Sequence, residues 1–555
     1  MPEYLSPGVY VEEVDRGPKP IESVGTAMAA FVGFTEKAEL LREIDGELIA
    51  EDLLNRPQLV TNWTQFVERY GDFTPGAYLA HAVYGYFLNG GSRCYVVSVR
   101  TIPKAQTALL NNAGKPQLIV RARQAGFEGL RLRVKVKDVP ELPAPKGKPA
   151  AKGKEDEAAP AEAEPEAVAG ASTDSFTLIV EREKVTGGWK LIEEVKDVTL
   201  HEVKDDGRTE VRVAYKDNKI PALIELLVPG AGVPLAQLWP REQEQTLIIE
   251  SRQLPAPTSA EFQGKVTERS GVEGLEALED VTMVVVPDLM SAMPGEKVGL
   301  ETIKAVQTMM LAHSERLGDR VAILDAPPDL TPQEVKKWRM DIAGFDSSYA
   351  AMYYPWITVM DPATNRPINV PPSGHIAGVW ARNDSTRGVH KAPANEVVQG
   401  AIGLAYQTTK GEQDTLNPIG VNCIRGFPGR GIRVWGARTL SSNPSWRYIN
   451  VRRLFNMVEK SIEGGTQWVV FEPNDRKLWA RVRRDVTAFL RTVWRTGALF
   501  GSTPEEAFYV KCDDELNPPE TRDLGQLIIE IGLAPVKPAE FVIFRISQWA
   551  GPGAE

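Results

Sequence analysis

The chain has 555 residues, of which 43% are hydrophobic and 25% charged, the proportions of an ordinary globular protein. They exclude a wholly disordered chain, a collagen and a coiled-coil rod, and no apolar run approaches the roughly 20 residues that a membrane helix needs. The formal net charge of −10 argues against a general nucleic-acid-binding protein.

Positive charge is concentrated in one region. Residues 375–500 contain 19 lysines and arginines against 9 acidic residues. This excess indicates either a face that binds an acidic partner or a solvated basic surface. The widely spaced Cys94, Cys423 and Cys512 form no CxxC pair, and the first ten residues lack the basic and apolar segments of a secretory signal. We therefore expect a protein that folds in a reducing cytoplasm, without a disulfide framework or a structural zinc site.

Residues 1–24 are predicted to form an N-terminal arm. Val9, Tyr10 and Val11 begin a short alternating strand that lies between the turn at residues 6–8 and the proline-rich residues 16–20. A single isolated strand cannot stabilise itself, so we expect it to pair with a sheet elsewhere in this chain or in another chain.

An α/β domain is predicted from residues 25–100 together with 276–390. Runs of apolar residues at 31–34, 94–99, 281–286 and 320–325 are typical of buried parallel strands. Helices are expected between them, at residues 62–70, 78–88 and 300–317, and a capping box at Thr331 opens another.

Residues 101–275 interrupt this pattern. Short strand-like runs at residues 118–120, 130–136, 176–180, 189–192, 211–215 and 246–249 predict a β-rich insertion domain. Within it, residues 140–172 consist mainly of proline, alanine, lysine and glutamate and contain no aromatic residue. Such a composition cannot bury enough apolar surface to fold, so we predict that it is disordered.

A C-terminal α+β domain is predicted over residues 391–534, followed by a C-terminal arm over residues 535–555. Strands are expected at residues 420–424, 431–435, 466–471, 508–512 and 525–531, and helices at 448–462 and 475–495. The second helix has one apolar stripe and an opposite face rich in arginine. Beyond Pro535 and Pro538, a strand at residues 541–546 is apolar on most positions of both faces, so we expect it to be sandwiched in another sheet.

Catalytic chemistry is weakly supported by the sequence. Asp288 and Asp325 follow buried strands, where catalytic carboxylates often lie, but no phosphate-binding glycine loop accompanies them, and each is expected to start a turn or cap a helix. Ser373, His375, His390 and Asp384 could be imagined as a hydrolytic triad. Ser373 lies outside a GxSxG motif, however, and a structural turn or an interface histidine is the favoured interpretation. We predict no catalytic residues, no cofactor and no metal site; the alternative is a hydrolase-like α/β enzyme with a β-rich accessory domain.

Long stretches of the chain resemble the contractile tail sheath family of phages and extracellular contractile injection systems. They include the N-terminal SPGVYVEEV, the segments YLAHAVYGYFLNGGSRCYVVSV and VPPSGHIAGVWARNDSTRGVHKAPANE, and the C-terminal WVVFEPNDRKLW and APVKPAEFVIFRI. The resemblance covers both ends and most of residues 280–549. It does not extend to the insertion at residues 101–275.

The resemblance implies a structural subunit of a phage tail or phage-tail-like particle and not an enzyme. Such subunits assemble in the bacterial cytoplasm as stacked hexameric rings around an inner tube, contact baseplate and tail-terminator or cap proteins, and contract to drive the tube through a target envelope. No direct membrane insertion and no nucleic-acid binding are expected. The family's arms add strands to neighbouring subunits, a role that here would fall to Val9, Tyr10, Val11, Phe541, Val542, Ile543, Phe544 and Ile546.

The basic helix at residues 475–495 is the predicted contact with an acidic inner tube. Its charge and the implied architecture together point to five side chains on its polar face: Arg476, Lys477, Arg483, Arg484 and Arg491.

Overall fold

The structure is a computed structural model that describes residues 21–44, 47–102, 104–125, 127–139, 175–184, 187–205, 208–216, 219–228, 235–248, 257–293 and 296–545. Three sequence-based predictions lie outside these residues. They are the N-terminal strand with Val9, Tyr10 and Val11, the low-complexity stretch at residues 140–172, and Ile546 at the C-terminal end.

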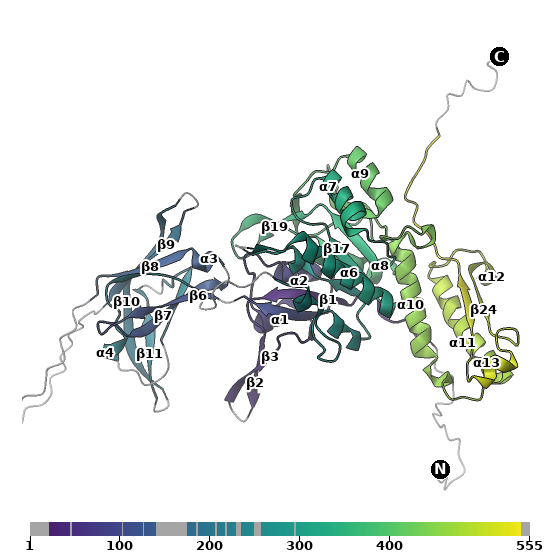
Figure 1. Cartoon of the computed structure of the whole chain (residues 1–555), viewed down its shortest axis with the longest axis horizontal. Coiled ribbons are helices and arrows are strands. Elements are labelled where there is room, and N and C mark those ends of the chain that lie inside the picture. The colour runs from purple at the N-terminus through teal and green to yellow at the C-terminus, as the bar shows by residue number, and fades with distance from the viewer. Residues whose placement is uncertain are drawn as a thin grey trace, which may run out of the picture.

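An eight-stranded mixed sheet forms the centre of the molecule (Figure 1). Its strands, in spatial order, are β23 (Gly431–Val434), β22 (Val421–Phe427), β18 (Ala350–Tyr354), β17 (Val321–Asp325), β14 (Met283–Val285), β1 (Ala29–Thr35), β5 (Cys94–Thr101) and β4 (Gln58–Val60). The inner pairings, from β22 to β5, are parallel, and both edge strands are antiparallel to their neighbours. The predicted parallel sheet is therefore confirmed.

Helices cover both faces of this sheet, which explains why its strands are apolar on both sides. Along β1, Ala30, Val32 and Phe34 face the core that includes α6 (Leu300–Leu317) and α7 (Pro332–Lys337). Ala29 and Phe31 face the opposite core, with α1 (Trp63–Tyr70), α2 (Leu79–Leu88) and α8 (Ser373–Arg387). The predicted capping box of Thr331 with Glu334 is present. At the start of α1, Asn62 accepts a hydrogen bond from the backbone of Gln65.

Smaller elements complete this body. They are the hairpins β2 (Glu39–Ile44) with β3 (Glu47–Asp52) and β15 (Ala292–Met293) with β16 (Glu296–Lys297), the sheet of β19 (Ile357–Asp361), β20 (Arg366–Val370) and β21 (Ala401–Leu404), the helices α5 (Ser259–Gln263) and α9 (Lys410–Leu416), the π-helix Trp338–Ala343, and the 3₁₀ turns Glu273–Ala277, Pro287–Met290, Asn417–Ile419 and Pro444–Trp446.

The insertion is a β domain that projects from the body (Figure 1). One sheet contains β11 (Arg208–Ala214), β10 (Trp189–Asp205), β9 (Phe176–Glu183), β8 (Leu132–Lys137) and β13 (Gln243–Thr246), and the other contains β12 (Ile224–Leu227), β7 (Pro116–Ala125) and β6 (Lys104–Leu110). The short helices α3 (Phe127–Leu130) and α4 (Leu235–Leu238) accompany them. The two sheets enclose an apolar core of their own, so this segment is organised as a separate domain.

The C-terminal unit packs two long helices, α10 (Ile449–Gly465) and α11 (Arg476–Arg495), against a two-stranded sheet of β24 (Phe508–Lys511) and β25 (Glu530–Leu533). Two short helices, α12 (Pro504–Ala507) and α13 (Pro519–Asp523), lie in the connections. The apolar stripe predicted for the second long helix is confirmed, because Leu478, Val482 and Val486 are buried in this core.

Two domain boundaries differ from the sequence-based expectation. The C-terminal domain was expected to begin at residue 391, but β22 and β23 are strands of the large sheet. The insertion was expected to extend to residue 275, but Phe262 and Leu275 belong to the core of the body. Both differences arise from contacts between residues far apart in the chain, which local patterns do not reveal.

Two local predictions are also wrong. Residues 466–471 form a turn with a short 3₁₀ segment (Gln467–Val469) in place of a strand, because they connect two helices that pack side by side. Ser373 opens helix α8 and does not lie in a turn. Residues 541–545, predicted as part of a strand that pairs with another sheet, form neither helix nor strand within the described chain, and that pairing remains a prediction.

Candidate functional site

Helix α11 presents a basic face to solvent. The five predicted contact residues are all exposed, opposite the apolar stripe that packs in the C-terminal core. Lys477, Arg484 and Arg491 follow one another at intervals of seven residues, so they lie in one row along the helix. At 1.5 Å per residue, the row spans about 21 Å.

The members of this face differ in their intramolecular partners. Arg476 pairs with Asp514 at 3.0 Å, and Nη1 of Arg483 donates to the carbonyl oxygen of Cys512 at 3.3 Å. Arg484 forms an ion pair with its neighbour Asp485, at 3.0 Å. Within the described residues, the side chains of Lys477 and Arg491 make no ion pair or hydrogen bond. The row Lys477, Arg484 and Arg491 is therefore the part of the face most available to an acidic partner.

The end of the N-terminal arm and the residues directly after it are anchored to helix α10. Ile21 is buried in the C-terminal core, and the backbone amide of Val24 donates to Oγ of Ser461 at 3.0 Å. The backbone oxygen of Thr26 accepts a hydrogen bond from Nη2 of Arg453 at 2.8 Å. Arg453 also forms a two-point ion pair with Asp384, at 2.9 and 2.6 Å, and Oγ1 of Thr26 donates to the same carboxylate. These contacts join three segments that are remote in sequence.

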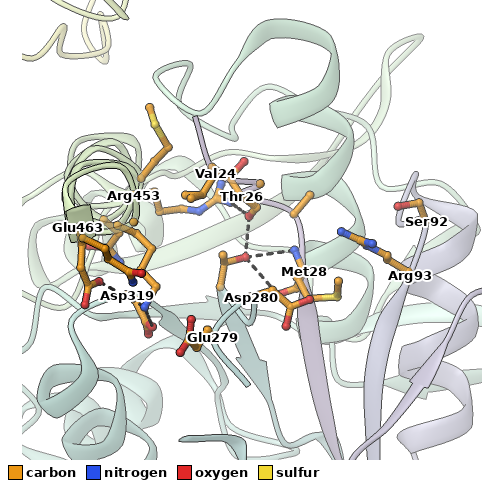
Figure 2. Close-up of a pocket in the computed structure, with 18 residues that line it drawn as sticks. Val24, Thr26, Met28, Ser92, Arg93, Glu279, Asp280, Asp319, Arg453 and Glu463 are labelled. Atoms are coloured by element: carbon orange, nitrogen blue, oxygen red, sulfur yellow. Dashed lines mark hydrogen bonds and ion pairs between the residues drawn. The ribbon is translucent and has the colours of Figure 1, made fainter. Parts of the chain in front are cut away.

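A cleft of about 530 Å³ lies beside this anchor, between residues 24–28, the loop before β14 and helix α10 (Figure 2). Figure 2 shows Arg453 and Thr26 on one side of the cleft, with Glu279, Asp280, Asp319 and Glu463 also on its walls. Nζ of Lys460, on α10, lies 3.6 Å from Oδ2 of Asp319. The walls carry both signs of charge, and the described residues contain no group of His, Cys, Asp and Glu that could hold a metal ion.

The C-terminal tail is anchored by Glu540. Its carboxylate accepts hydrogen bonds from Nη2 of Arg438 at 2.7 Å, Nδ2 of Asn417 at 2.7 Å and the hydroxyl of Tyr448 at 3.1 Å. Burial alone would raise the pKa of Glu540, but these hydrogen bonds and the charge of Arg438 outweigh burial and lower it. The carboxylate is thus held in its charged form.

Immediately beyond this anchor, the tail leaves the subunit. Phe541, Val542, Ile543 and Phe544 are 69–84% exposed. Four consecutive large apolar side chains in solvent are unfavourable in a finished assembly, because burying each would contribute about 1.5–3 kcal/mol.

The carboxylates considered for catalysis are helix caps. Asp288 accepts hydrogen bonds from the backbone amides of Phe34, at 2.6 Å, and Tyr78, at the start of α2. Asp325 accepts from the backbone amide and hydroxyl of Ser373, at 2.9 and 2.5 Å, at the start of α8. Burial raises the pKa of each aspartate to about 7, against these hydrogen bonds. Both therefore position helices on the sheet, as one of the sequence-based interpretations proposed.

The imagined triad is not assembled. Ser373 bonds to Asp325, and Asp384 pairs with Arg453, so neither is available to a histidine. His375 is buried against Gly85 of α2, and burial and the neighbouring His81 lower its pKa to about 3. A neutral, enclosed imidazole with no nucleophile beside it fits a packing role.

Sequence reasoning missed the anchoring residues Arg453, Asp384, Arg438 and Glu540. Each pairing joins positions at least 69 residues apart. A local signal existed only for Glu540, the one acidic residue of the segment APVKPAEFVIFRI.

Geometry of this kind defines a structural protein: its chain ends are fixed at their roots and its exposed surfaces suit other proteins, while its buried carboxylates serve the fold. Family models agree. The phage tail sheath protein central domain matches residues 264–440, and the phage tail sheath C-terminal domain matches residues 441–548, together slightly more than half of the chain. The chain belongs to the contractile tail sheath family.

Curated relatives support the assignment. A putative prophage major tail sheath protein of Pseudomonas aeruginosa is 29% identical over 316 residues, which cover 54% of this chain and 76% of that protein. The tail sheath protein of Vibrio phage KVP40 is 30% identical over 177 residues, or 31% of this chain, and the match spans only 26% of that relative.

Solved structures share the fold over nearly the whole chain. The sheath of the extracellular contractile injection system PVC in its contracted state has a TM-score of 0.54 and 23% identity, covering 99% of both chains. The helical sheath of the anti-feeding prophage, also contracted, has a TM-score of 0.55 and 22% identity, covering 98% of this chain and 99% of that one. The prediction of a sheath subunit and not an enzyme is confirmed by the family match. No helix in the described ranges is long and apolar enough to cross a membrane.

Proposed function

We propose that this subunit polymerises as stacked rings of six around an inner tube and that contraction of the polymer drives the tube through a target envelope. The observation that carries the proposal is the C-terminal tail, which is fixed at its root by Glu540 and has no strand pairing over residues 541–545 of the described chain. Residues 541–544 are bare apolar chain directly after the Glu540 anchor. A monomer gains nothing from such a tail, whereas a polymer can bury it.

The arms are the links between subunits. Val9, Tyr10 and Val11 at one end, and Phe541, Val542, Ile543, Phe544 and Ile546 at the other, would add strands to sheets of neighbours. The two-stranded sheet β24–β25 supports this role, because a pair of four-residue strands is marginal alone and its outer edges are unpaired in the described chain. Each added ladder hydrogen bond would contribute about 0.5–1.5 kcal/mol.

Deletion of residues 1–20 tests the arms. The shortened subunit is expected to fold and to remain soluble but to form no tubes in electron micrographs. Deletion of residues 143–170, in the insertion, is the matched control and is expected to leave tubes intact. Tubes of normal length from the chain lacking residues 1–20 would show that the N-terminal arm is not a link.

The basic face of α11 is the contact with an acidic inner tube. Arg476, Lys477, Arg483, Arg484 and Arg491 would make exposed ion pairs that are individually worth about 0–1 kcal/mol. Weak contacts suit an interface that separates when the sheath expands, and repetition along the polymer holds the extended state in register. The row of Lys477, Arg484 and Arg491 would contribute most.

Reversal of this row tests the tube contact. The triple variant Lys477→Glu, Arg484→Glu, Arg491→Glu is expected to give empty or prematurely contracted sheaths, and high salt is expected to mimic it. The control reverses Lys336 and Lys337, two exposed lysines of α7 on the body. Extended, tube-filled particles from the triple variant would contradict the assignment of α11.

The remaining features of the proposal follow from the same architecture. Assembly takes place in the bacterial cytoplasm, and the ends of the polymer meet a baseplate and a tail-terminator or cap protein. The insertion domain faces outward, away from the tube, since it lies at the opposite end of the subunit from α11 (Figure 1).

A further inference from the structure

We propose that helix α10 is the common anchor of both arms, and that Glu540 and Arg453 are the residues that fix where the arms leave the subunit. The proposal rests on the proposed linking role of the arms and adds the path by which one arm is coupled to the other. The anchoring contacts of both arms lie within one chain.

The N-terminal arm is fixed along the middle and end of α10. Arg453 holds the backbone oxygen of Thr26 and stacks over the ring of Trp380, with 4.7 Å between its Cζ atom and the ring centroid. The side chains of Arg453 and Asp384 are each only 4% exposed. Further along, Ser461 accepts the backbone amide of Val24, and Ile21 packs against Gly465. Residues 21–26 therefore follow α10 for about three turns.

The C-terminal arm is fixed at the first turn of the same helix. Nδ2 of Asn450 donates to the backbone oxygen of Val536 at 3.1 Å, and the hydroxyl of Tyr448 donates to Glu540. Arg438 and Asn417 complete the Glu540 site from the body, on the segments that flank the β22–β23 hairpin. Glu540 is thus held at once by the body and by the start of α10.

Helix α10 is suited to couple the two roots because it belongs to both cores. Ile449 is buried in the core beside the large sheet, whereas Leu454 and Val458 are buried in the C-terminal core. Between Tyr448 and Ser461 the helix spans about 20 Å of continuous hydrogen-bonded backbone. A force that a neighbouring subunit applies to either arm therefore acts on helix α10, which moves the body and the C-terminal unit together.

The test measures mobility at the arm root in the full chain, kept as dilute, unassembled subunits. A nitroxide on Ala539→Cys reports on the residue next to the anchor, and the native cysteines Cys94, Cys423 and Cys512 are buried, so the introduced cysteine is labelled selectively. In the Glu540→Ala background we expect loss of the immobilised spectral component. Glu540→Gln is expected to lose part of it, because its amide NH₂ cannot accept from Asn417 or Arg438.

Glu459→Ala is the matched control. Glu459 forms an ion pair with Arg452 on the same helix, at 3.2 Å, but touches neither arm, so the nitroxide spectrum should not change. A second label on Glu22→Cys, combined with Arg453→Met, applies the same measurement to the N-terminal root. Glu540→Ala is expected to leave this second root immobile, which would separate local release from general unfolding.

The outcomes distinguish the anchor from the linking role. A mobile tail in Glu540→Ala subunits that also fail to form tubes supports both. A mobile tail in subunits that assemble normally supports the anchor and contradicts the linking role of the C-terminal arm. A tail as immobile in Glu540→Ala as in the unmodified chain overturns the anchor, whatever the assembly result.

Discussion

The ion pair between Arg453 and Asp384 permits a quantitative prediction about subunit stability. Both side chains are almost fully buried, and the guanidinium makes three hydrogen bonds, two to Asp384 and one to the backbone oxygen of Thr26. Arg453→Met keeps the apolar stem but leaves the carboxylate of Asp384 with only the hydroxyl of Thr26. Leaving such a buried charge unpaired costs about 3–5 kcal/mol.

A double-mutant cycle separates the coupling free energy of Arg453 and Asp384 from the other effects of each substitution. Asp384→Asn removes the charge from the other side, and the double variant contains no unpaired charge, so it should be more stable than the sum of the single changes implies. We expect the two changes to be coupled by at least about 2 kcal/mol. The free energy of unfolding would be measured by urea denaturation of the whole chain, followed by tryptophan fluorescence. Additive single effects, or an Arg453→Met loss below about 1 kcal/mol, would refute the reasoning.

Three further predictions concern the helices that cover the sheet and the insertion. Burial lowers the pKa of His81 to about 4, from about 6.5 in the unfolded chain, so between pH 7 and pH 5 only the unfolded state gains a proton. The native chain should lose about 2 kcal/mol relative to His81→Gln over that interval, and a constant difference in urea midpoints would contradict this. A Cβ atom on Gly378 would lie 2.5 Å from the backbone oxygen of Tyr86, so Gly378→Ala should cost about 1–3 kcal/mol in thermal unfolding. Gly464→Ala, where a Cβ meets nothing within 4 Å, should be neutral or stabilising. Particles lacking residues 143–170 should contract on the same trigger as unmodified ones, and loss of contraction would place the insertion within the moving interfaces.

Elements with a strong local pattern could be predicted from the sequence. The sequence alone predicts the secondary structure of β1, β5, β17 and α11. A strand buried on both faces is a short continuous apolar run, and a helix buried along one stripe repeats apolar residues every three or four positions. The exposed arginines of α11 could be predicted for the same reason, since they occupy the helix positions outside the apolar stripe.

Features that depend on distant partners could not be predicted. Residues 466–471 have a high β propensity, with Thr466, Trp468, Val469, Val470 and Phe471, but a connection between two packed helices leaves no neighbouring strand for them. The membership of β22 in the large sheet depends on parallel pairing with β18, about 70 residues earlier. The same limit applies to the anchors, where a carboxylate at residue 540 finds its arginine at residue 438.

Electron microscopy of the purified full-length chain tests the central claim most directly. A sheath subunit whose arms link neighbours should form long hollow tubes of uniform diameter without any other protein. Tubes with six-fold symmetry, in which density for residues 541–545 crosses into an adjacent subunit, are the predicted result. A discrete soluble oligomer at high protein concentration, with the C-terminal segment folded back on its own subunit, would contradict the account.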